Sequence, residues 1–152
     1  MKGKSPQAQL TAFLAKFDPK IATLAKAILV RMRARLPGAV QLVYDNYNAL
    51  AIGFGPTERA SDVIFSIALF PRWVTLFFLH GVTLPDPRRV LRGSGKVVRH
   101  VVLQTAAELD SPAIRDLMAL ALKRAAKPLD GTARSRIVIK SVSTKQRPRR
   151  PA

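Results

Sequence analysis

The sequence predicts an α+β domain in which helices pack on one face of an antiparallel sheet of four to five strands. Apolar residues recur at helical spacing near both ends of the chain, and short runs rich in β-branched and aromatic residues lie between them. The links between those runs are too short for parallel crossovers, which favours antiparallel neighbours. A block of strands with helices at both ends is typical of the α+β class.

The N-terminal part of the chain predicts two helices. Residues 7–16 have the spacing of a short helix. Asp18 is a suitable N-cap for a second helix that starts at Pro19, where the missing N–H costs nothing. Apolar residues recur at helical spacing over 21–36, and Pro37-Gly38 ends the helix.

The middle of the chain predicts strands separated by turns. Residues 40–45 and 48–54 are two short β-prone runs. Residues 88–92 have the composition of a single helical turn, and 96–103 predict a further strand. A last helix starts near residue 112, after Asp110 or Ser111 as its cap. The basic residues at its end, Lys123, Arg124 and Lys127, suit the negative end of the helix dipole.

Residues 63–82 form an apolar segment of twenty residues that contains one charge. Its hydropathy approaches that of a membrane-spanning helix. Pro71 and Arg72 lie at its centre, however, and each half has the length and composition of a strand. We therefore expect a core hairpin joined across residues 70–73 and no membrane span.

Composition excludes several classes of chemistry. The 152 residues include no cysteine, which excludes a disulfide scaffold, a thiolate metal site and a cysteine nucleophile. With 48% hydrophobic residues the chain has enough apolar material for a packed core. The polar start lacks the apolar centre of a signal peptide, so a cytoplasmic location is the expectation. No cofactor and no metal site are predicted.

The net charge of +17 is concentrated toward the C-terminus. Residues 134–152 carry seven basic side chains and no acidic one. We therefore predict one domain over 1–133 and a basic, flexible tail over 134–152, in which 137–139 could form a short anchoring strand. Nucleic acid is the expected partner of this tail, although an anionic membrane surface or a merely solubilising role explains the charge equally well. The residues that would contact nucleic acid are Lys145, Arg147, Arg149 and Arg150.

A glycine-containing loop with basic neighbours is the first candidate binding surface. Guanidinium groups and free N–H groups beside glycine can hold a phosphate or a carboxylate. The segment lacks the first glycine and the Ser/Thr of a Walker A loop, and a solvated loop is the plain alternative. The residues of this candidate site are Arg88, Arg89, Arg92, Ser94, Lys96 and Arg99.

A polar and aromatic turn at residues 44–48 is the second candidate surface. Tyr44, Asp45 and Tyr47, together with Trp73 and His80, could line a pocket at one end of the sheet. In such a pocket Asp45 could act as a base or a metal ligand. The alternative is a structural turn in which the polar side chains satisfy their own backbone and the rings cover the edge of the core.

Three segments, 36–50, 70–78 and 91–100, resemble the YdhG-like domain family of small bacterial proteins. The resemblance extends over about residues 8–126 and implies a compact α+β domain. Some members of that family are described as frataxin-like iron chaperones, a role that would rest on acidic surface residues. Here the first helices contain one acid, Asp18, against eight lysines and arginines before Pro37, so no iron ligands are carried over.

These observations favour a cytoplasmic, non-enzymatic binding module for an anionic small molecule or an acidic protein surface. Two alternatives stay open: a frataxin-like iron-binding chaperone, and sequence-independent nucleic-acid binding through the tail. No set of side chains matches a catalytic triad or a nucleophile elbow.

Overall fold

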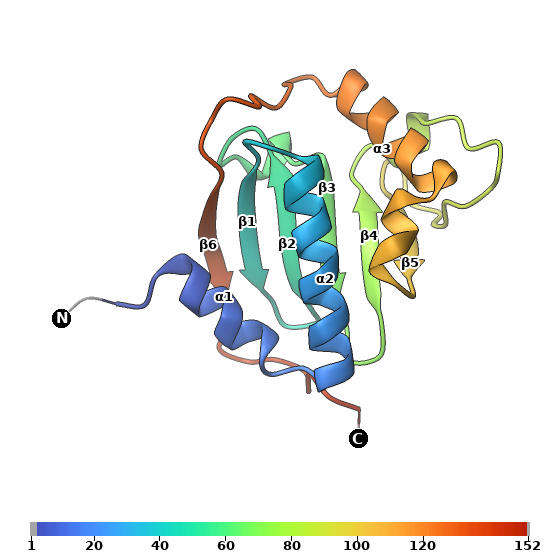
Figure 1. Cartoon of the computed structure of the whole chain (residues 1–152). Helices are drawn as coiled ribbons and strands as arrows, with labels where there is room; N and C mark the ends of the chain where they lie inside the picture. Colours follow the sequence, from blue (N-terminus) through green and yellow to red (C-terminus); the bar gives the residue numbers. More distant parts are fainter. Residues whose placement is uncertain (1–2, 152) are drawn as a thin grey trace.

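The computed structural model describes residues 3–151 and has the expected α+β architecture. Figure 1 shows helices against one side of a single sheet, with α1 and the segment that follows β6 near its lower end. The helices and strands, in chain order, are α1 (Pro6–Leu14), α2 (Pro19–Arg35), β1 (Val40–Asp45), β2 (Leu50–Gly55), β3 (Phe65–Leu69), β4 (Val74–Phe78), β5 (Arg99–Leu103), α3 (Pro112–Arg124) and β6 (Arg136–Val142). Three short 3₁₀ turns complete the list: η1 (Ala60–Asp62), η2 (Gly81–Thr83) and η3 (Ala106–Asp110).

The sheet is mixed, and in the described residues it contains six strands in the order β5-β4-β3-β2-β1-β6. Consecutive strands from β1 to β5 pair antiparallel, as predicted. The prediction of four to five purely antiparallel strands is wrong at one edge, because β6 pairs parallel to β1. The chain reaches that edge from the far side of the sheet, after α3, and this long connection makes a parallel strand possible.

The core lies between the sheet and the helices. α1 and α2 cross one face of the sheet (Figure 1), and their apolar residues join the alternate residues of the strands in one buried cluster. Ser5 and Asp18 cap α1 and α2 by accepting hydrogen bonds from backbone N–H groups, and both helices begin with a proline. A smaller cluster around Val40, Leu42 and Val63 lies on the other face of the sheet.

The apolar segment 63–82 forms the predicted hairpin. β3 and β4 pair antiparallel from Phe65 opposite Phe78 to Leu69 opposite Val74. The backbone N–H of Phe70 donates to the carbonyl of Trp73 and closes the turn. Among the described residues, no helix is both long enough and apolar enough to cross a membrane.

Residues 88–92 do not form the predicted helical turn. The carboxylate of Asp86 accepts hydrogen bonds from the backbone N–H groups of Val90 and Leu91, at 3.0 and 2.8 Å. Arg89 has a φ of 52°, which is outside the range of a right-handed helix. The side chain of Asp86 thus takes the N–H groups that a helix would use.

The C-terminal segment is built into the fold. The strand expected at 137–139 is present and longer, because β6 covers Arg136–Val142 along the edge of β1. The following residues were expected to form a flexible arm, but they run under the lower end of the sheet (Figure 1) and hydrogen-bond to it. The backbone N–H groups of Ser143 and Arg147 donate to the carbonyls of Asp45 and Tyr47.

Candidate functional site

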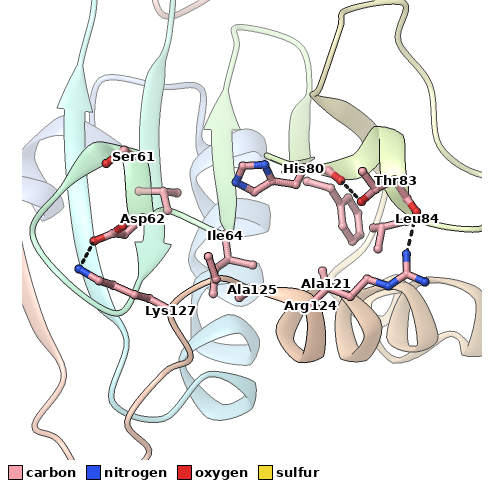
Figure 2. A pocket seen from close by; sticks show the side chains of 13 residues that line it. Ser61, Asp62, Ile64, His80, Thr83, Leu84, Ala121, Arg124, Ala125 and Lys127 are labelled. Atoms are coloured by element: carbon pink, nitrogen blue, oxygen red, sulfur yellow. Dashed lines mark hydrogen bonds and ion pairs between the residues drawn. The ribbon is translucent and has the colours of Figure 1, made fainter.

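A pocket of about 280 Å³ opens between three segments at the upper end of the sheet. Its lining comes from η1 with the residues that lead to β3, from the end of β4 with η2, and from the last turn of α3 with the residues after it. Figure 2 shows the side chains that point toward the space between these segments. The lining residues are Ser61, Asp62, Val63, Ile64, Phe78, His80, Thr83, Leu84, Ala121, Arg124, Ala125, Ala126 and Lys127.

The walls of this pocket are apolar and its rim is polar. Ile64, Phe78 and Leu84 are almost fully buried and belong to the main core cluster, so the apolar part of the pocket is continuous with the packed core. The polar side chains come from different segments and approach the opening from opposite sides (Figure 2). An apolar body with polar groups at the mouth is the common form of a small-molecule site.

The charges at the rim are positive in sum. The guanidinium of Arg124 donates to the carbonyl of Thr83 at 2.7 Å, which joins α3 to η2. Lys127 lies 3.5 Å from the carboxylate of Asp62, so these two charges offset each other. A hydrogen bond from the Thr57 hydroxyl, with Lys127 nearby, holds the pKa of Asp62 below its ordinary value. The Arg124 charge has no carboxylate partner among the described ion pairs.

The predicted loop site lies beside this pocket but does not line it. Arg99 folds back on the loop, and its guanidinium donates to the carbonyls of Gly95 and Val98 at 2.6 and 2.8 Å. The backbone of Arg92 pairs with that of His100. Ser94 and Lys96 are exposed. The loop therefore has a defined conformation, and its basic side chains are not brought to one point by any described contact.

Acidic side chains lie close to the first part of that loop. Arg88 is 3.6 Å from the carboxylate of Asp116 on α3, and both side chains are mostly exposed. Arg88, Asp86 and Asp116 all line a more open hollow of about 460 Å³ beside the N-terminal half of α3. Arg89 next to them is exposed and has no described ion pair. Two carboxylates at this hollow make it less attractive to an anion than the pocket in Figure 2.

The structure makes Asp45 a structural anchor. Its side chain is fully buried and accepts a hydrogen bond from Lys16 at 2.7 Å and another from Arg149 at 2.9 Å. Burial by itself raises the pKa of Asp45, but these hydrogen bonds and the charge of Lys16 outweigh burial and lower its pKa overall. Both carboxylate oxygens of Asp45 are thus held by cationic side chains, an arrangement that does not suit a general base.

The aromatic residues of the second predicted surface are divided among different places. Tyr47 and Trp73 lie in the two hairpin turns at the lower end of the sheet, and both are 44% exposed. His80 follows β4 at the other end and lines the pocket described above. Tyr44 packs on the small cluster around Val40, Leu42 and Val63. Its buried hydroxyl has no hydrogen-bond partner in the described part of the chain.

The four basic residues assigned to nucleic acid have different surroundings. Arg149 is buried and donates to Asp45 and to the carbonyl of Asn46. Arg147 lies over the ring of Tyr47, with the guanidinium carbon 5.7 Å from the ring centre. Arg150 donates to the carbonyl of Lys16, and Lys145 is exposed. Three of the four side chains therefore remain accessible.

The nine acidic side chains of the chain all have structural partners. Five of these carboxylates form ion pairs, and the other four accept hydrogen bonds from backbone N–H groups. Within residues 3–151, no three His, Asp or Glu side chains are grouped in a way that could hold a metal ion. The ion-paired acids are Asp45, Glu58, Asp62, Asp110 and Asp116, and the others are Asp18, Asp86, Glu108 and Asp130.

Sequence reasoning missed the pocket because its residues are spread over three segments. Arg124 and Lys127 were interpreted only as partners of the α3 dipole. The alanines at positions 121, 125 and 126 were the available signal, since small residues at and just after the last turn of an amphipathic helix leave space beside it. No protein-family model, curated protein or solved structure matches this chain. The resemblance to YdhG-like domains therefore stays a prediction.

Proposed function

We propose that this protein is a binding module for a small anionic ligand with an apolar body, held in the pocket between η1, η2 and the end of α3. The observation that carries the proposal is the position of Arg124, a cation without a carboxylate partner at the mouth of an apolar-walled pocket. A carboxylate on an apolar group matches both parts of such a site.

The pocket supports this function through its size and its charge. Its volume, about 280 Å³, is at the lower limit of ligand pockets, which span roughly 300 to 1,000 Å³. This favours a compact molecule. Only one N–H group of the Arg124 guanidinium donates to Thr83, so the guanidinium retains other N–H donors for a carboxylate. Ser61 and His80 offer further polar groups from the opposite side (Figure 2).

A direct binding experiment tests the proposal. Benzoate, hexanoate and 4-phenylbutyrate are added to the full chain, and binding is followed by calorimetry and by ligand-observed NMR. We expect at least one carboxylate to bind, and its uncharged amide to bind at least tenfold more weakly, because the amide cannot use the positive rim. The double variant Arg124→Gln, Lys127→Gln should lose that preference.

A neighbouring lysine provides the matched control. Lys123 is on the same last turn of α3, is exposed and does not line the pocket. Lys123→Gln changes the net charge by one unit but should leave carboxylate binding within twofold of the unmodified protein. Equal losses in Lys123→Gln and Arg124→Gln would show that overall charge, and not the pocket, attracts the anion. Absence of binding by all three carboxylates would contradict the proposal.

A further inference from the structure

The lower end of the sheet, opposite the pocket, presents a second and independent surface. It consists of the hairpin turns 46–49 and 70–73 and the docked segment 143–151, which we call the turn surface. β2 begins opposite the end of β3, with Leu50 paired to Leu69, so both turns project from the same end of the sheet. In Figure 1 the C-terminal segment passes below this end.

Two exposed aromatic rings distinguish the turn surface. Tyr47 and Trp73 are the most exposed aromatic residues in the described chain, each at 44%. Trp73 stacks on Phe70, with 5.5 Å between ring centres, which holds the indole in place while one side remains open. The two hairpins are separated by two strand spacings, roughly 10 Å. Held at such a distance, the two rings could contact separate bases of one flexible strand.

Positive side chains surround these rings. Arg147 lies against Tyr47, and Arg72 is an exposed neighbour of Trp73 in the same turn. Lys145 and Arg150 are also exposed. Asp45 is the acid nearest to the docked segment, and it is buried and neutralised by Lys16 and Arg149. The accessible charge around the rings is therefore positive.

We propose that the turn surface binds single-stranded nucleic acid without sequence preference. Exposed rings stack on unpaired bases of any kind, and the arginines and lysine beside them contact the phosphates. Base pairs in a duplex are already stacked and do not present their faces to such rings. An acidic protein or a simple polyanion would use the same positive charges but would gain nothing from Tyr47 and Trp73.

The ring contribution separates this proposal from general attraction between charges. Fluorescence anisotropy measures the binding of labelled dT20 and of a 20-bp duplex to the full chain. Inorganic polyphosphate is added as a competitor. We expect dT20 to bind more tightly than the duplex at the same salt concentration and polyphosphate to compete poorly. Tyr47→Ala and Trp73→Ala should each weaken dT20 binding about fivefold or more, whereas Tyr47→Phe and Trp73→Phe keep a ring and most of the affinity.

Two further variants complete the test. Arg72→Gln and Arg147→Gln should each reduce the slope of log affinity against log salt by about 0.7, the value for one lost phosphate contact on a single strand. Val82→Ala removes an equally exposed apolar side chain at the other end of the sheet and should leave binding unchanged. The proposal is overturned if the duplex or polyphosphate binds as tightly as dT20, or if the alanine variants at Tyr47 and Trp73 bind dT20 as the unmodified protein does.

Discussion

Asp45 and Arg149 form an ion pair at 2.9 Å, although 104 residues separate them in the chain. The side chains are 0% and 5% exposed, which is rare for charged residues that are not tied to a partner. Arg149 also donates to the carbonyl of Asn46 and lies over the ring of Phe17. The segment around Arg149 is thereby fixed beneath the first hairpin by one buried guanidinium.

Removing Arg149 should therefore destabilise the whole domain. In Arg149→Ala, the buried carboxylate of Asp45 keeps Lys16 as its only charged partner, and the free energy of unfolding should fall by about 3 kcal/mol. Urea unfolding measures the change. Arg150→Ala is the matched control, since this neighbouring side chain is exposed, and it should change stability by less than about 0.5 kcal/mol. Equal effects would show that Arg149 is not the anchor.

The lowered pKa of Asp45 predicts that the domain loses stability at acidic pH. The folded state lowers the pKa of Asp45, so the folded protein binds its proton less readily than the unfolded chain does. Stability from this group is fully present above the ordinary Asp pKa of about 3.9 and is lost as the pH falls through the lower folded value. Asp62 and Asp130 have lowered pKa values too and act in the same direction.

Unfolding free energy measured between pH 7 and pH 2 tests this dependence. The curve should be flat down to about pH 5 and should then decline. In Asp45→Asn the slope of the unfolding free energy against pH should be smaller by up to about 1.4 kcal/mol per pH unit, the contribution of one bound proton. The variant should be less stable throughout. An unchanged slope in Asp45→Asn would mean that other carboxylates account for acid unfolding.

Local patterns were sufficient to predict most of the fold. β1 has the predicted bounds Val40–Asp45, and α2 starts at the predicted Pro19 after its Asp18 cap. These features depend on residues a few positions apart. The parallel pairing of β6 with β1 depends on a contact between distant segments, and no local pattern distinguishes a parallel edge strand from an antiparallel one.

The sites were less predictable, for a related reason. Arg149 lies in a segment without apolar residues, which is typical of a solvated tail, and only the position of Asp45 explains its burial. The pocket likewise exists only where η1, η2 and α3 meet. Tyr47 and Trp73 both lie at the lower end of the sheet, because the β1–β2 and β3–β4 hairpin turns project from the same end. His80 follows the end of β4 and therefore lies at the opposite end of the sheet from these two turns.

Gly38 should be intolerant of any side chain. Its φ is 81°, and a Cβ atom there would lie 1.9 Å from the carbonyl oxygen of Asp130, in the segment that leads to β6. Gly38→Ala combines a strained backbone with a clash against main chain, so we expect a loss of more than about 2 kcal/mol in thermal or urea unfolding. Gly131→Ala is the control, because its Cβ would meet nothing closer than 3.9 Å. Similar stabilities of the two variants would contradict the close approach.

Filling the pocket separates its role in binding from its role in stability. Ala121 faces the pocket from α3, and Ala121→Leu would place three additional carbon atoms in it without lowering helix propensity appreciably. We expect the carboxylate that binds the unmodified protein to lose at least tenfold in affinity, because the new side chain occupies its space.

The stability of Ala121→Leu should stay the same or rise by about 1 kcal/mol, since the added apolar surface is removed from water. Ala119→Leu introduces the same side chain on the exposed face of α3 and should leave ligand affinity unchanged. Calorimetric titration and thermal unfolding of both variants give the two quantities separately. A loss of affinity that occurred only together with unfolding, or in both variants alike, would remove the pocket as the ligand site.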